Sequence, residues 1–109
     1  MAGKKYGIVM AAKVPGSYHQ MSKEDQEIPG KVMEQLMPKY AGKVDFLRRI
    51  WTSAFSAEVT DVFYIECDDL ADFHAFSQEM DDIMASKGKN PESFGSTVSV
   101  WVGINPDAE

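Results

Sequence analysis

Residues 54–79 read AFSAEVTDVFYIECDDLADFHAFSQE, and this stretch decides the fold of the chain. Residues 59–67 are rich in β-branched and aromatic side chains, which favour a strand. Asp69 follows in a helix-capping position, and from Leu70 onward apolar residues recur at helical spacing. The stretch therefore predicts a strand that passes directly into a capped helix. That helix carries His74, one of the two histidines of the chain.

The segments on either side of this stretch predict the other strands. Residues 6–14 and 97–104 carry apolar residues at adjacent as well as alternating positions, which is typical of strands covered on both sides. Residues 44–52 have the same character. The short loop over residues 53–57 should join them to residues 59–67 as an antiparallel hairpin.

A further helix is predicted over residues 29–40, after a short turn that Ser22 caps. Proline is tolerated in the first helical position, whereas Pro38 should distort or end the helix. Gly42 stands just past the expected end. The element order is then β-α-β-β-α-β, the order of a ferredoxin-like α+β sandwich with a four-stranded antiparallel sheet. Residues 1–109 fit a single domain of this kind.

Composition excludes several classes of partner. The formal net charge is −6, from 17 acidic and 11 basic residues, which argues against nucleic acid because its phosphates need clustered lysine and arginine. Cys67 is the only cysteine, so an intrachain disulfide and a four-cysteine zinc site are both excluded. No apolar run approaches the roughly 20 residues that span a bilayer. We therefore expect no membrane partner and a cytoplasmic location.

Two adjacent arginines lie on the predicted second strand. In a regular strand Phe46 and Arg48 share one face, and Arg49 and Trp51 share the other. One arginine is then partly buried and needs a partner, for which Asp61 or Glu66 on the next strand is a candidate. Alternatively, an arginine in a cleft binds a substrate carboxylate or a haem propionate through its planar guanidinium. The sequence leaves both roles open.

The strands carry apolar side chains on both faces, as Phe63 and Tyr64 illustrate. Helices cover only one face of this sheet, and a solvated second face would alternate with polar residues. We therefore predict that the second face is buried against another copy of the chain in a twofold dimer. The alternative is ordinary strand composition in a monomer.

The chain resembles the dimeric α+β-barrel superfamily, in which two ferredoxin-like subunits close their sheets into one barrel. Residues 54–79 are similar to darcynin-like proteins. The stretches KVPGSYHQMSKEDQE (residues 13–27) and KYAGKVDFLRRIWTSAF (residues 39–55) resemble the chlorite-dismutase-like branch. Members include haem-binding enzymes, cofactor-free monooxygenases, polyketide cyclases and proteins of unknown role. The resemblance implies a ligand cavity between sheet and helices, and it does not choose the ligand.

The resemblance also implies a haem role for His74, since some haem-degrading members carry their proximal histidine on the corresponding helix. Those members use an asparagine in the first strand and a tryptophan in the third. This chain has Met10 or Ala11 and Tyr64 there, so that catalytic set is absent. The other reading of His74 is a residue at the edge of the apolar stripe that hydrogen-bonds the next turn of its own helix.

The remaining candidates are a loop histidine and large aromatic residues. His19 precedes the first helix, where a side chain either borders a pocket or is simply solvated. Tyr64, Trp51 and Trp101 offer apolar walls for an aromatic or polycyclic ligand. They are equally what a small core and a barrel interface need.

Three functions are consistent with these residues. The first is capture of a hydrophobic, partly anionic small molecule, with Arg48 or Arg49 holding its carboxylate. Haem ligation by His74 is its most specific form. The second is cofactor-free catalysis on an aromatic or polyketide-like substrate, with His74 or His19 as base and Tyr64 as proton donor. The third is a non-catalytic dimer, and the sequence does not decide whether the protein is an enzyme.

Overall fold

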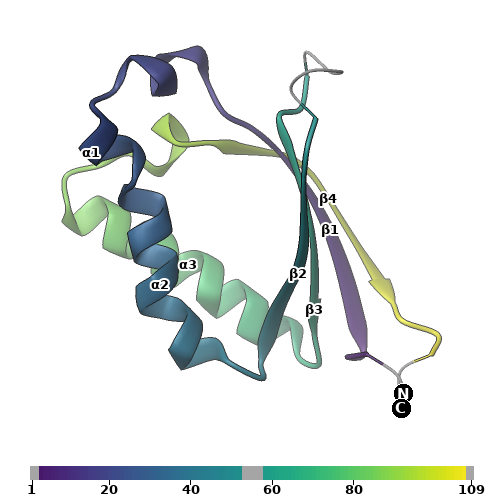
Figure 1. The fold of residues 1–109 in the computed structure, drawn as a ribbon. Coiled ribbons are helices and arrows are strands. Elements are labelled where there is room, and N and C mark those ends of the chain that lie inside the picture. The colour runs from purple at the N-terminus through teal and green to yellow at the C-terminus, as the bar shows by residue number, and fades with distance from the viewer. Residues whose placement is uncertain (1–2, 53–57, 108–109) are drawn as a thin grey trace.

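The computed structural model describes residues 3–52 and 58–107 (Figure 1). The predicted loop over residues 53–57 lies outside this part of the chain. The elements follow one another in the order β1 (Tyr6–Lys13), η1 (Gly16–Gln20), α1 (Lys23–Gln26), α2 (Ile28–Tyr40), β2 (Val44–Trp51), β3 (Asp61–Cys67), α3 (Leu70–Ser86), η2 (Pro91–Ser93) and β4 (Ser96–Ile104). The predicted order of strands and long helices is therefore confirmed, with two short 3-10 turns added.

The four strands form one antiparallel sheet in the order β2-β3-β1-β4. Figure 1 shows α2 and α3 on the same side of this sheet, and none of the described residues forms a helix on its other side. This arrangement confirms the predicted ferredoxin-like α+β fold. The side of the sheet without helices is called the open face below, and the other side the helical face.

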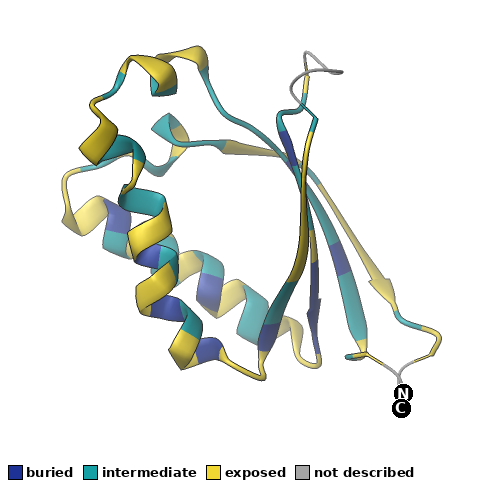
Figure 2. Ribbon diagram, in the orientation of Figure 1, coloured by how far each residue is buried: buried dark blue, intermediate teal, exposed yellow. Residues whose placement is uncertain are grey.

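The core lies between the helical face and the two long helices (Figure 2). Ile8 and Ile65 are directly paired across β1 and β3, and both are fully buried. Leu36 of α2 and Phe76 of α3 cover them from the helix layer. The ring of Phe76 packs 5.0 Å from that of Phe46 on β2. Burial of these side chains follows the predicted apolar stripes.

The predicted helix starts are confirmed, and so is the predicted end of α2 at Tyr40. Ser22 accepts a hydrogen bond from the Asp25 backbone N–H, and Asp69 accepts one from Ala71. Pro38 does not end α2, because the helix continues for two more residues to Tyr40. Proline in the last turn removes a single hydrogen-bond donor, and the burial of Tyr40 holds that turn in place.

A bulge in β2 corrects the predicted pattern of faces. Phe46 pairs with Ile65 and Arg48 pairs with Tyr64, so Leu47 is an extra residue between two consecutive pairs. Beyond the bulge, Arg49 therefore points to the same face as Phe46. Regular alternation predicts that Phe46 and Arg48 share a face of the sheet, and this prediction is wrong. The two arginines still occupy opposite faces, as predicted.

A charged cluster joins the end of α2 to the middle of α3. The Lys39 ammonium donates to both oxygens of the Glu79 carboxylate at 2.9 Å, and the Tyr40 hydroxyl donates to one of them at 2.7 Å. The hydrogen bond from Lys39, followed by that from Tyr40, lowers the pKa of Glu79. The same contact with Glu79 raises the pKa of Lys39.

We expect Glu79→Gln to lower the thermal midpoint at pH 7, since the ionised carboxylate holds both donors. A lowered native pKa contributes stability above the unfolded pKa of about 4.3, and this contribution is lost as the pH falls through the native value. The difference in thermal midpoint between the variant and the wild type should therefore become smaller toward pH 3. Melting curves followed by circular dichroism at both pH values measure it. A difference in thermal midpoint that stays constant with pH would contradict stabilisation by the ionised Glu79 carboxylate.

Candidate functional site

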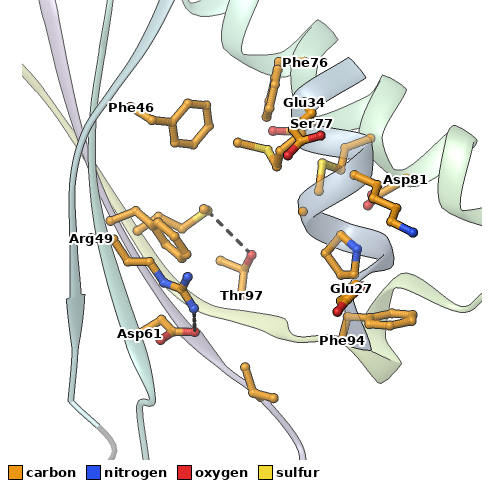
Figure 3. A pocket seen from close by; sticks show the side chains of 18 of the residues that line it. Glu27, Glu34, Phe46, Arg49, Asp61, Phe76, Ser77, Asp81, Phe94 and Thr97 are labelled. Atoms are coloured by element: carbon orange, nitrogen blue, oxygen red, sulfur yellow. Dashed lines mark hydrogen bonds and ion pairs between the residues drawn. The ribbon is translucent and has the colours of Figure 1, made fainter. Parts of the chain in front are cut away.

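A cavity of about 1050 Å³ lies between the helical face and the helix layer (Figure 3). Its apolar wall combines sheet residues with residues of α3 and of the segment before β4. The main contributors are Met10, Phe46, Phe63, Phe73, Met80 and Phe94. The fold produces this cavity because the helices pack closely over only one end of the sheet, where the fully buried core residues gather (Figure 2).

Arg49 brings a positive charge to this apolar wall. Its guanidinium lies 3.5 Å from the Asp61 carboxylate on the neighbouring strand. The guanidinium carbon is also 5.3 Å from the ring centre of Trp51 and 5.7 Å from that of Phe63, within the range of cation–π attraction. The Arg49 side chain remains 54% exposed, so part of its donor set is free to meet a ligand.

The helix side of the cavity is acidic. Glu27, Glu34 and Asp81 all contribute to the lining, and Figure 3 places them opposite Arg49 and Asp61. Lys31 is the basic lining residue on this side. The sheet side therefore carries Arg49 with its partner Asp61, and three further carboxylates line the helix side. A ligand with an anionic end is favoured to direct that end toward Arg49.

The structure places part of the predicted site at the cavity. Arg48 and Arg49 both contribute to its lining, and Trp51 flanks Arg49. The Arg49–Asp61 ion pair is among the arginine–carboxylate pairings that the sequence left open. Arg48 contributes to the lining, although its cross-strand partner Tyr64 belongs to the open face.

The two histidines lie elsewhere. His74 and His19 are both exposed, and neither contributes to the cavity lining. The ring of His19 packs edge-on against Tyr18 at 5.5 Å. In the alternative reading, His74 bonds to Gln78 or Asp81, but among the described residues Gln78 instead donates to Asp82. The structure therefore does not bring the two histidines together with the arginines.

Tyr64 belongs to a separate polar cluster on the open face. Its hydroxyl donates to the Glu66 carboxylate at 2.6 Å, and the other oxygen of Glu66 accepts from the Lys4 backbone N–H at 3.0 Å. The hydrogen bond to Glu66, reinforced by burial, raises the pKa of Tyr64. A hydroxyl held in this way is a poor proton donor to a ligand on the helical face.

The open face exposes large apolar side chains. Trp101 is 60% exposed and Ile50 is 50% exposed. Their strand pairing with Val9 and Val62 places them on the same face. Surface of this kind on a monomer marks an interaction site when it forms a contiguous patch.

Metal and thiol chemistry have little support in the described residues. Within residues 3–52 and 58–107, no three or more histidine, cysteine, aspartate or glutamate side chains gather closely enough to hold a metal ion. Cys67 is fully buried, and burial raises the pKa of its thiol. A raised pKa keeps the thiol protonated and unreactive. Over the same described ranges, no helix has the length and apolar character needed to cross a bilayer.

Several lining residues were not predicted from the sequence. Phe94 and Thr97 come from the segment around η2, which the sequence indicated only as a polar loop and the start of a strand. The one available signal was Phe94 itself, a large apolar residue in an otherwise polar stretch. Glu34 gave no signal, because it is indistinguishable in sequence from a solvated helical residue.

The fold is similar to that of solved chlorite dismutase structures from Candidatus Nitrospira defluvii. A mutant of that enzyme superimposes with a TM-score of 0.70 at 14% identity, over 94% of this chain and 41% of the other. The complex with imidazole gives 0.70 and 14%, over 95% and 41%. A further mutant gives 0.71 and 14%, over 98% and 43%.

The chain thus spans about two fifths of the length of each of these enzymes. Neither a protein-family model nor a curated protein sequence matches it. At such low identity the likeness extends to the three-dimensional arrangement and not to the chemistry. The chain has a chlorite-dismutase-like fold.

Proposed function

We propose that this protein binds a hydrophobic small molecule with an anionic group in the cavity of the helical face. The observation that supports this most directly is Arg49, a partly exposed guanidinium set among Phe63, Trp51 and the other apolar side chains of the wall. Apolar cavities with a few placed polar groups are the usual form of small-molecule sites. Arg49 fixes the anionic end, and the aromatic wall covers the body of the ligand.

Size is consistent with a ligand of two or more fused rings. The cavity volume of about 1050 Å³ lies just above the usual range for such sites, roughly 300–1,000 Å³. A single benzene ring would leave most of the wall uncovered. Phe63 on the sheet and Phe73 on α3 contribute to opposite walls of the cavity, so a flat aromatic body is well suited to the space.

Haem is the most specific ligand suggested by the resemblance, and the cavity fits it only in part. The apolar wall and Arg49 suit a porphyrin and one propionate. Neither His74 nor His19 contributes to the cavity lining, so this wall offers no imidazole to the iron. The proposed function therefore does not depend on an iron centre.

The carboxylate requirement can be tested with 2-naphthoate as a fluorescent probe. We expect saturable binding that weakens about 10- to 100-fold in Arg49→Ala, the range for losing a charged hydrogen bond of about 1.5–3 kcal/mol. Lys43→Ala is the matched control, since it removes an exposed cation that does not line the cavity. An equal loss of 2-naphthoate affinity in both variants would overturn the proposal, and so would the absence of binding to the wild type.

A haemin titration tests the iron-containing form separately. If His74 ligates haem at a place outside the cavity, a saturable shift of the Soret band will be weaker in His74→Ala. The same shift in variant and wild type would exclude His74 as the ligand. Either result is independent of naphthoate binding at Arg49.

We further propose that the protein is a homodimer that buries the open face. Trp101 and Ile50 support this, since both are at least half exposed on a face that no helix covers. A twofold interface would place each copy of this face against the same face of the other. The cavity of the helical face would remain open to ligand in each subunit.

A further inference from the structure

We infer that the ligand carries a hydroxyl group near its carboxylate, and that Asp61 selects for this hydroxyl. The inference rests on the proposed function, because it assigns a specificity to the same cavity. It follows from the pairing of Arg49 and Asp61, which presents a donor and an acceptor side by side (Figure 3).

Asp61 is unusual among the acidic residues of the cavity because it is buried. Only 6% of the residue is exposed, whereas Glu27, Glu34 and Asp81 are all exposed. Its position at the start of β3, opposite Ala12 on β1 and Trp51 on β2, encloses it between two strands.

Asp61 also has acceptor capacity to spare. A carboxylate offers about four lone-pair sites. Among the residues that the structure describes, its side chain has the single ion pair with Arg49 and no hydrogen bond. That contact, at 3.5 Å, is longer than the roughly 2.7–2.9 Å of a strong charged hydrogen bond. A buried carboxylate with one distant partner is an effective acceptor for a ligand hydroxyl.

The same geometry penalises a ligand that has a carboxylate alone. An anion bound by Arg49 comes within a few ångströms of Asp61, and two negative charges at that separation repel in a poorly solvated wall. A ligand hydroxyl placed between them donates to Asp61 and replaces the repulsion with a hydrogen bond. Sites built around a substrate hydroxyl discriminate strongly against analogues that lack it.

The position of the hydroxyl on the ring matters. A hydroxyl ortho to the carboxylate bonds to that carboxylate and is not free for Asp61. A meta hydroxyl cannot reach its own carboxylate, so it stays free to donate to Asp61 while the carboxylate contacts the neighbouring Arg49. The inferred ligand class is therefore a fused aromatic acid with a meta hydroxyl on the same ring.

Three probes of nearly equal size test this by isothermal titration calorimetry. They are 2-naphthoate, 4-hydroxy-2-naphthoate with the meta hydroxyl, and 6-hydroxy-2-naphthoate with its hydroxyl on the far ring. We expect the meta compound to bind the wild type about tenfold more tightly than 2-naphthoate, as for one charge-assisted hydrogen bond. The far-ring hydroxyl should give no comparable gain.

Asp61→Asn separates recognition from structural support. Removing the charge should weaken binding of the meta compound and strengthen binding of 2-naphthoate, because repulsion of the carboxylate is relieved. A purely structural role for Asp61 would weaken both probes together, and that result would overturn the inference. The comparison of probes on the wild type requires no variant to fold.

The outcomes distinguish this inference from the function on which it rests. Similar affinity of the wild type for 2-naphthoate and the meta compound would overturn the inference and leave the proposed function intact. An equal gain in affinity from the meta hydroxyl and from the far-ring hydroxyl would also overturn the inference, since only the meta hydroxyl can reach Asp61. Failure of all three probes to bind would refute both proposals.

Discussion

Leu36→Ala should lower the free energy of unfolding by about 2–5 kcal/mol, the range for removing a large buried aliphatic side chain. Leu36 is 2% exposed and packs at the centre of the core between α2 and the sheet. A chain of this size has a total stability of about 5–15 kcal/mol, so the loss is a large fraction. Urea unfolding followed by circular dichroism measures it.

Leu47→Ala is the matched control, because it makes the same chemical change at a residue that is 55% exposed. It should alter the free energy of unfolding by less than about 0.5 kcal/mol. Similar losses for the two leucines would mean that Leu47 is covered in solution or that the core is not where the structure places it.

Trp101→Glu should convert the proposed dimer into a monomer. The substitution puts a charge on the open face at the edge strand β4, where burial without a partner is prohibitively unfavourable. Multi-angle light scattering after size exclusion should give a mass of two chains for the wild type and one for the variant. Circular dichroism shows whether the variant keeps its fold, which exposure of Trp101 leads us to expect.

The second tryptophan supplies the control for this experiment. Trp51 is 72% exposed, but its pairing with Asp61 assigns it to the helical face. Trp51→Glu should therefore leave the mass at two chains. A wild-type mass of one chain, or dissociation in both variants, would contradict burial of the open face between copies.

The fold could be predicted from the sequence because its signals are local. Asp69 and the apolar stripe beginning at Leu70 identify α3 from adjacent residues alone, and the structure confirms both. The bulge at Leu47 could not be predicted in this way. Its existence depends on how β2 registers against β3, and nothing in the residues around Leu47 marks an extra position.

The site was harder to predict than the fold for a related reason. Arg49 and Asp61 were recognised as possible partners, but choosing between Arg48 and Arg49 required the strand register. His74 stood at the edge of an apolar stripe, where a rotation of the helix by a few tens of degrees decides between cavity and solvent. The structure places it in solvent.

The bulge at Leu47 has a consequence for aligning this chain with others. Leu47 is an unpaired residue between two consecutive pairs of β2 and β3. Beyond Phe46, each residue of β2 therefore stands one position later in the sequence than a regular strand would place it in the sheet. An ungapped alignment to a relative with a regular strand would match Arg48 to the position that Arg49 occupies. A one-residue gap at Leu47 restores the correspondence, and a deletion there should leave Arg49 at the cavity.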